Sequence, residues 1–182
     1  LITQEAKIDS WGVGTRLITS LDCPSFGGVY KLSAIQKDGV FQPRMKLSDN
    51  QWKVTNPGNK KIYRVYEKES GKIKADLITL ADETFTSDKP LLLFDPLATW
   101  KKTYLKPNTY VLRELLVPVF LKGECVYTSP SVMEIREYCA REQNTLWDEC
   151  RRLTNPHNVY VDLSQKLYDL KTNLLNSYFN GI

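Results

Sequence analysis

Two glycines flank a single valine near the start of the chain, and a threonine and an arginine follow directly, as Gly12-Val13-Gly14-Thr15-Arg16. Residues without a side chain let backbone N–H groups approach an anion closely. Where such a turn opens a helix, the free N–H groups and the helix dipole favour a phosphate group. Thr15 adds a hydroxyl donor and Arg16 adds a positive charge. The turn is therefore a candidate phosphate-binding loop, and its alternative interpretation is a plain tight turn that binds nothing.

The residues around this turn predict the elements that position it. Residues 1–7 have the pattern of the end of a helix, Lys7–Trp11 that of a short strand, and Arg16–Leu21 that of a helical or irregular stretch. A further strand is predicted at Val29–Ile35. Because the first residue is a leucine and the chain starts inside a helix–strand unit, we expect a fragment of a longer protein. In α/β barrels the loops after the last strands often bind phosphate, which favours the phosphate interpretation.

The rest of the chain divides by pattern into two further regions. Residues 36–110 favour an antiparallel meander, with strands predicted at Arg44–Leu47, Lys60–Tyr66, Ala75–Leu80 and Pro90–Phe94. Residues 111–182 are mainly helical. There we expect a helix or strand at Thr109–Val119 and an extended piece at Glu124–Tyr127. The capping box Ser131-x-x-Glu134 predicts the start of a helix that runs to about Leu153. A strand at Val159–Leu163 and a last helix, which Ser164 caps and Gly181 ends, follow. The three predicted regions are thus 1–35, 36–110 and 111–182.

Composition limits the possible functions. The chain has 182 residues, with 42% apolar and 25% charged residues, as in ordinary globular domains. No apolar run approaches the roughly 20 residues that span a bilayer, and no secretory signal is visible. The net charge of +4 suits anionic small molecules, and its dispersed basic residues favour neither nucleic acid nor a membrane as partner. The four cysteines form no C-x-x-C pair, so we expect no metal site and free, buried thiols in the cytoplasm.

Five blocks, in order, resemble the nicotinate phosphoribosyltransferases. They are Ile8–Ser20 around the glycine turn, Gly27–Leu32, Pro43–Ser48, Lys53–Lys61, and the closing blocks Asn155-Pro156-His157 and Tyr160–Ser164. Together they cover most of the chain, and each alone would be unspecific. The resemblance implies the C-terminal part of an irregular type II phosphoribosyltransferase α/β barrel, followed by a β-rich and helical C-terminal region.

The resemblance also implies roles for particular residues. Gly12, Gly14 and Thr15, with Arg16 beside them, fall on the loop that holds the 5-phosphate of the ribosyl donor or product. Four lysines fall in basic blocks expected near pyrophosphate or nucleotide phosphates, namely Lys46, Lys53, Lys60 and Lys61. Such charges neutralise a leaving pyrophosphate. The alternative for each lysine is a solvated charge at a strand end.

The implied activity is the formation of nicotinate mononucleotide from nicotinate and phosphoribosyl pyrophosphate, coupled to ATP hydrolysis. Mg²⁺ and ATP are the implied cofactors, and a homodimer is expected. The family's phosphorylated histidine is expected upstream, so no catalytic residue is assigned to this chain, and His157 is interpreted as a structural or surface residue. Two alternatives stay open. One is a non-catalytic phosphate-binding or assembly fragment that needs the missing N-terminal part. The other is a related transferase that uses nicotinamide or quinolinate.

Overall fold

The computed structural model describes residues 5, 7–10, 12–22, 24–25, 28–50, 53–98 and 100–180. The chain divides into two compact units, residues 1–31 and 32–182. In the described part of the first unit, the regular element is the short helix α1 (Thr15–Ile18), and the apolar side chains Leu17, Ile18, Val29 and Tyr30 are exposed. This unit therefore has no apolar core within its described residues.

The strands predicted for the first unit are wrong. Residues 7–10 form no strand, and Trp11 lies outside the described residues, as do most of the residues expected to end a helix. In place of the strand predicted at Val29–Ile35, β1 begins only at Ala34. The physical reason is pairing, because a strand needs a hydrogen-bonded neighbour and residues 7–10 have none among the described residues. The helix expected after the glycine turn is confirmed, but it is short.

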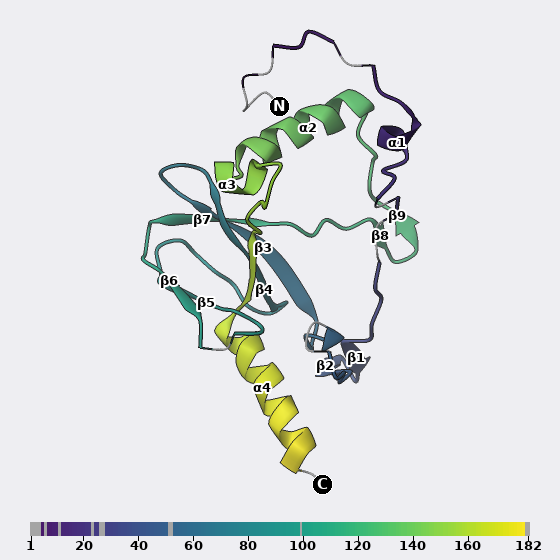
Figure 1. Ribbon diagram of the computed structural model, residues 1–182. Coiled ribbons are helices and arrows are strands. Elements are labelled where there is room, and N and C mark those ends of the chain that lie inside the picture. Colours follow the sequence, from purple (N-terminus) through teal and green to yellow (C-terminus); the bar gives the residue numbers. More distant parts are fainter. Residues whose placement is uncertain are drawn as a thin grey trace. The chain divides into compact units, whose positions relative to one another are not determined.

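A six-stranded sheet forms the centre of the second unit (Figure 1). The hydrogen-bonded order of its strands is β6-β5-β10-β4-β3-β7. Its strands are β3 (Lys60–Glu67), β4 (Ile73–Leu80), β5 (Leu91–Phe94), β6 (Lys102–Leu105), β7 (Tyr110–Glu114) and β10 (Tyr160–Leu163). All neighbours are antiparallel except β10 and β4, which run parallel. Two small hairpins, β1 (Ala34–Lys37) with β2 (Val40–Pro43) and β8 (Phe120–Leu121) with β9 (Glu124–Cys125), are the other paired strands among the described residues.

Each face of the sheet carries its own apolar cluster. On one face, here called the Leu77 face, Val65, Ala75, Leu77, Leu91, Leu93, Leu105 and Tyr110 are buried together. On the opposite Ile78 face, Phe94 and Leu163 pack with Leu167 of the last helix, α4 (Gln165–Asn180). Strict alternation of buried and half-buried residues along β4 produces the two faces. The unit is thus a mixed α/β fold in which α4 packs on the sheet.

Helices α2 (Val132–Asn144) and α3 (Asp148–Arg151) replace the single helix predicted to about Leu153. The predicted capping box of Ser131 and Glu134 is present at the start of α2, and the Ser164 hydroxyl accepts from the N–H of Leu167 at 3.2 Å. The helix is interrupted at Thr145, whose carbonyl accepts from the N–H of Ile73 at 2.8 Å. This bond ties the break to β4, whereas a continuous helix would need that carbonyl for its own ladder.

Several strand predictions are confirmed. β3, β4, β5 and β10 confirm the predicted ranges within a few residues, and Thr109–Val119 contains the strand β7 rather than a helix. The prediction at Arg44–Leu47 is wrong, because this segment is extended but has only isolated backbone bonds, such as that from Arg44 to Ser33. The described cysteines are free thiols, as expected, but Cys125 and Cys139 are exposed rather than buried. Gly181 lies outside the described residues.

The division into regions 1–35, 36–110 and 111–182 stays a prediction. β10 comes from the third of these regions, yet it lies between β5 and β4. None of the described helices has both the length and the apolar character that a membrane crossing requires.

Candidate functional site

The glycine turn leads directly into α1, with Gly14 as the residue before the helix. Gly14 has an extended backbone, and no side chain caps the helix. The Gly14 carbonyl accepts from the N–H of Leu17 at 3.1 Å, while the N–H groups of Thr15 and Arg16 have no acceptor within the described part of the chain. The turn therefore presents free N–H donors, and a phosphate group can accept hydrogen bonds from them.

Neither glycine of the turn is required by the backbone or by packing. Gly12 and Gly14 do not have a positive φ, and a Cβ built on either meets nothing within 4 Å. By contrast, Gly58 has φ +91° and its Cβ would lie 2.7 Å from a Leu80 methyl, so there glycine is needed for structure. What Gly12 and Gly14 provide is open space beside the free N–H groups.

The four predicted lysines belong to the second unit and lie in different surroundings. Lys46 is exposed in the extended segment after β2, and its carbonyl accepts from Thr55 N–H at 3.3 Å. Lys53 is exposed in a short turn. Lys60 begins β3, where its ammonium donates to the Gly58 carbonyl at 2.6 Å and burial lowers its pKa. Lys61 follows on the same strand, so its side chain points to the opposite face of the sheet. The lysines therefore do not form a single cluster.

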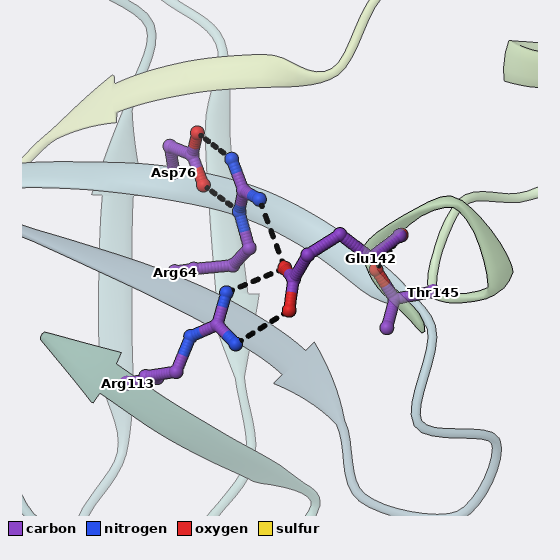
Figure 2. Close-up of polar contacts among 5 residues, drawn as sticks. All are labelled: Arg64, Asp76, Arg113, Glu142 and Thr145. Carbon is purple, nitrogen blue, oxygen red and sulfur yellow. Dashed lines mark hydrogen bonds and ion pairs between the residues drawn. The ribbon is translucent and has the colours of Figure 1, made fainter. Parts of the chain in front are cut away.

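The densest group of charges in the second unit links α2 to the sheet (Figure 2). Arg64 makes two bonds to Asp76, at 2.7 and 2.8 Å, and Arg113 makes a bidentate pair with Glu142 of α2. Arg64 also lies 3.6 Å from Glu142. The hydrogen bonds raise the pKa of Arg113 and lower that of Glu142. Two cations and two carboxylates satisfy one another, so the cluster fixes α2 and does not offer a ligand site.

A second carboxylate is arranged quite differently. Asp162 of β10 is only 6% exposed, and it has no hydrogen bond or ion pair among the described residues. Burial, with the nearby charge of Asp95, raises the pKa of Asp162 to about 6. Sequence reasoning quoted Asp162 within the closing block but assigned it no role. The sequence shows only an aspartate between the apolar residues Val161 and Leu163, and its face follows from the register with β4.

Lys171 was also passed over, whereas His157 was interpreted from the sequence. Lys171 of α4 donates to the Asn56 side chain at 2.8 Å, and burial lowers its pKa. His157 is exposed, and its backbone N–H donates to the Glu149 carbonyl at 2.9 Å, which agrees with the prediction of a structural or surface residue. Across the described ranges, no group of three or more His, Cys, Asp or Glu side chains is placed to hold a metal ion.

The fold of the second unit is that of a mixed α/β module, with a six-stranded sheet and a helix packed on one face of it. Residues 59–171 match the family model described as the nicotinate phosphoribosyltransferase C-terminal domain. The chain belongs to this family, and the resemblance found in the sequence is confirmed.

Individual relatives agree. The chain is 37% identical over 171 residues to the nicotinate phosphoribosyltransferase of Bacillus subtilis, with 94% of this chain and 34% of the relative covered. With the Caenorhabditis elegans enzyme of the same name it shares 34% over 168 residues, covering 91% and 28%. A crystal structure of human nicotinic acid phosphoribosyltransferase matches with a TM-score of 0.64 and 29% identity, over 83% of this chain and 27% of that chain. The chain thus spans about a third of the length of the curated relatives it matches.

Proposed function

We propose that this chain is part of an enzyme that forms nicotinate mononucleotide from nicotinate and phosphoribosyl pyrophosphate, coupled to ATP hydrolysis, in the biosynthesis of NAD. The observation that carries this proposal is the match of over nine-tenths of the chain to curated nicotinate phosphoribosyltransferases. In the proposed reaction the pyridine nitrogen of nicotinate bonds to the anomeric carbon of the ribose as the bond to pyrophosphate breaks.

For the glycine turn we propose binding of the 5-phosphate of the ribosyl donor. The free N–H groups of Thr15 and Arg16, the Thr15 hydroxyl and the Arg16 guanidinium supply donors, and the open space at Gly12 and Gly14 admits the anion. Binding energy at this remote phosphate orients the reacting carbon. The turn thus positions substrate and takes no part in bond making.

The four lysines have a proposed role with the pyrophosphate or nucleotide phosphates. Lys46 and Lys53 are exposed, as phosphate contacts must be. Because Lys60 and Lys61 face opposite sides of β3, a ligand bound on one face of the sheet contacts only one of them. The Lys60 ammonium is already engaged with the Gly58 carbonyl.

Further parts of the proposal concern the whole protein. We propose that residues 1–35 belong to an irregular type II α/β barrel, that the enzyme is a cytoplasmic homodimer, and that it uses Mg²⁺ and ATP. The described residues contain no group of three or more His, Cys, Asp or Glu side chains that could hold a metal ion, so we assign no Mg²⁺ ligand among them. No step of the proposed mechanism therefore runs through a metal held by these residues. ATP supplies free energy for the synthesis when bound.

A pair of glycine variants tests the turn. Gly14→Ala adds one methyl group where nothing lies within 4 Å, so folding is unaffected and any loss reports on the ligand. We expect a rise of about tenfold or more in the KM for phosphoribosyl pyrophosphate, equivalent to about 1.4 kcal/mol of binding. Gly28→Ala is the matched control, because its Cβ also meets nothing within 4 Å. Equal KM values for the two variants would contradict the proposed role.

The acceptor is tested separately by supplying nicotinate, nicotinamide and quinolinate in parallel, with and without ATP. We expect product from nicotinate, with more product when ATP is present. Preferential use of nicotinamide or quinolinate would refute the proposed substrate. Absence of product from all three acceptors would refute the proposed activity for the protein assayed.

A further inference from the structure

Asp162 is placed where the sheet otherwise carries apolar side chains. β10 pairs with β4 so that Asp162 lies beside Leu77, which puts both side chains on the Leu77 face. Leu163, the next residue, faces the opposite side and packs with Phe94. A carboxyl among apolar neighbours is costly unless it is hydrogen-bonded.

Thr79 and Ser164, the two other described polar residues that are buried as a whole, have the partners that Asp162 lacks. The Thr79 hydroxyl donates to the Leu80 carbonyl at 3.1 Å, and the Ser164 hydroxyl donates to Glu83 at 2.7 Å. Asp162, at 6% exposed, has no such bond to any described residue. Buried polar side chains almost always have a partner, so this carboxyl points to one that comes from elsewhere.

A pocket of about 340 Å³ gives such a partner access to the carboxyl. Asp162 lines it together with Ala75 and Leu93, which belong to the same face of the sheet. Trp147 also lines it, and the indole N–H donates to the Ile73 carbonyl at 2.7 Å, which fixes the ring. A carboxylate and a fixed aromatic ring in one pocket are the two groups that bind organic cations.

The charges around the pocket favour a cation. Glu149 supplies a second carboxylate. Asp95, whose charge acts on Asp162, lines a neighbouring pocket together with it. The basic group Lys74 is neutralised by Glu67 at 2.8 Å. The remaining titratable groups that line the pocket are Cys150, His157 and Tyr160.

We propose that this pocket binds an ammonium or guanidinium group, with Asp162 as the anionic partner and Trp147 as the aromatic wall. The raised pKa of Asp162 agrees with this proposal. Burial without a partner disfavours the ionised carboxylate, and a bound cation would stabilise that form. The cation comes from a small molecule or from a lysine or arginine side chain of another polypeptide segment. The site is independent of the glycine turn, so failure of either proposal leaves the other standing.

The first experiment measures binding of n-butylguanidinium by calorimetry, with n-butylurea as the uncharged probe of similar shape. Binding of the cation and not of the urea is expected, and Asp162→Asn should weaken it by about tenfold or more. Asp148→Asn is the control, because that side chain is 90% exposed and lies outside the pocket. Binding that is detected but is equal in wild type and Asp162→Asn, or equal for both probes, would overturn the proposal. Absence of binding leaves only the side-chain source of the cation, which the second experiment tests.

The second experiment needs no variant and separates the two sources of the cation. Carbon-13 NMR of labelled aspartate follows the titration of Asp162 in the wild-type protein. For a small-molecule ligand, the pKa lies near 6 and n-butylguanidinium lowers it by about one pH unit or more. If a lysine or arginine side chain already occupies the pocket, the pKa of Asp162 lies below its ordinary range, and a nuclear Overhauser effect connects Asp162 with that lysine or arginine. A raised pKa that the cation leaves unchanged, or a low pKa without that contact, refutes the site.

Discussion

Replacing Asp162 with asparagine is expected to stabilise the protein at neutral pH and not at acidic pH. The carboxyl is buried without a partner among the described residues, and its pKa is raised from the ordinary 3.8 to about 6. At about 1.4 kcal/mol for each pH unit, this difference corresponds to about 3 kcal/mol of unfolding free energy. Asparagine has nearly the same size but carries no charge, so the variant lacks this cost.

The direction of the pH dependence follows from the two states of the protein. The unfolded chain releases the Asp162 proton near pH 3.8, whereas the folded protein holds it until about pH 6. Below about pH 4 the group is neutral in both states, and the full stability is present. As the pH rises towards 6 the folded state must ionise a buried group, and the wild type loses up to about 3 kcal/mol relative to the variant.

Urea unfolding at several pH values between about 4 and 8 measures this difference directly. The quantity to compare is the change in unfolding free energy between wild type and Asp162→Asn at each pH, because the titration of every other group is common to both proteins. Asp148→Asn, at a side chain that is 90% exposed, should show no comparable pH dependence. A wild-type-to-variant difference that stays constant with pH would refute the reasoning.

Four further substitutions probe groups described above. The buried Tyr66 hydroxyl has no hydrogen-bond partner among the described residues, so Tyr66→Phe should raise the unfolding free energy by about 1 kcal/mol. Tyr110→Phe should lower it by about as much, because that hydroxyl lies within hydrogen-bond distance of two carbonyls. Urea unfolding distinguishes them, and a loss in both would contradict the assignment. Glu142→Gln removes the charge paired with Arg113 and should lower the unfolding free energy by about 2 kcal/mol. This difference should shrink in acid, because Glu142 of the wild type is then protonated. A difference that does not change with pH would argue against the ion pair. Ser131→Ala should cost about 1 kcal/mol and increase amide hydrogen exchange in the first turn of α2, and unchanged exchange would argue against the cap.

The local parts of the fold were predictable from the sequence because their causes are local. The capping box needs only a serine and a glutamate three residues apart, and the alternating residues of β3 and β4 specify two faces. The order of the sheet was not predictable in this way. Nothing in the residues of β10 says that they pair with β4 on one side and β5 on the other, because pairing depends on contacts far apart in sequence.

The candidate sites divide similarly. The glycine turn is a contiguous pattern, so it was visible in the sequence, and its proposed ligand came from resemblance to a family. Asp162 was missed because the lack of a partner is a property of the folded environment. An aspartate between two apolar residues reads equally as a solvated or as a buried group until the register with β4 is known.

The place of β10 in the sheet has a consequence for how the chain folds. β4 is joined to β3 and β5 to β6, but the two pairs meet only through β10. During synthesis, residues 60–114 therefore supply the strand pairs β3–β4 and β5–β6 before β10, the strand that joins them, has been made. Until residue 163 has left the ribosome, β4 and β5 each keep an unpaired edge, which is the kind of surface that misassociates. Nascent chains stalled just before residue 160 should therefore depend on chaperones far more than chains released after α4.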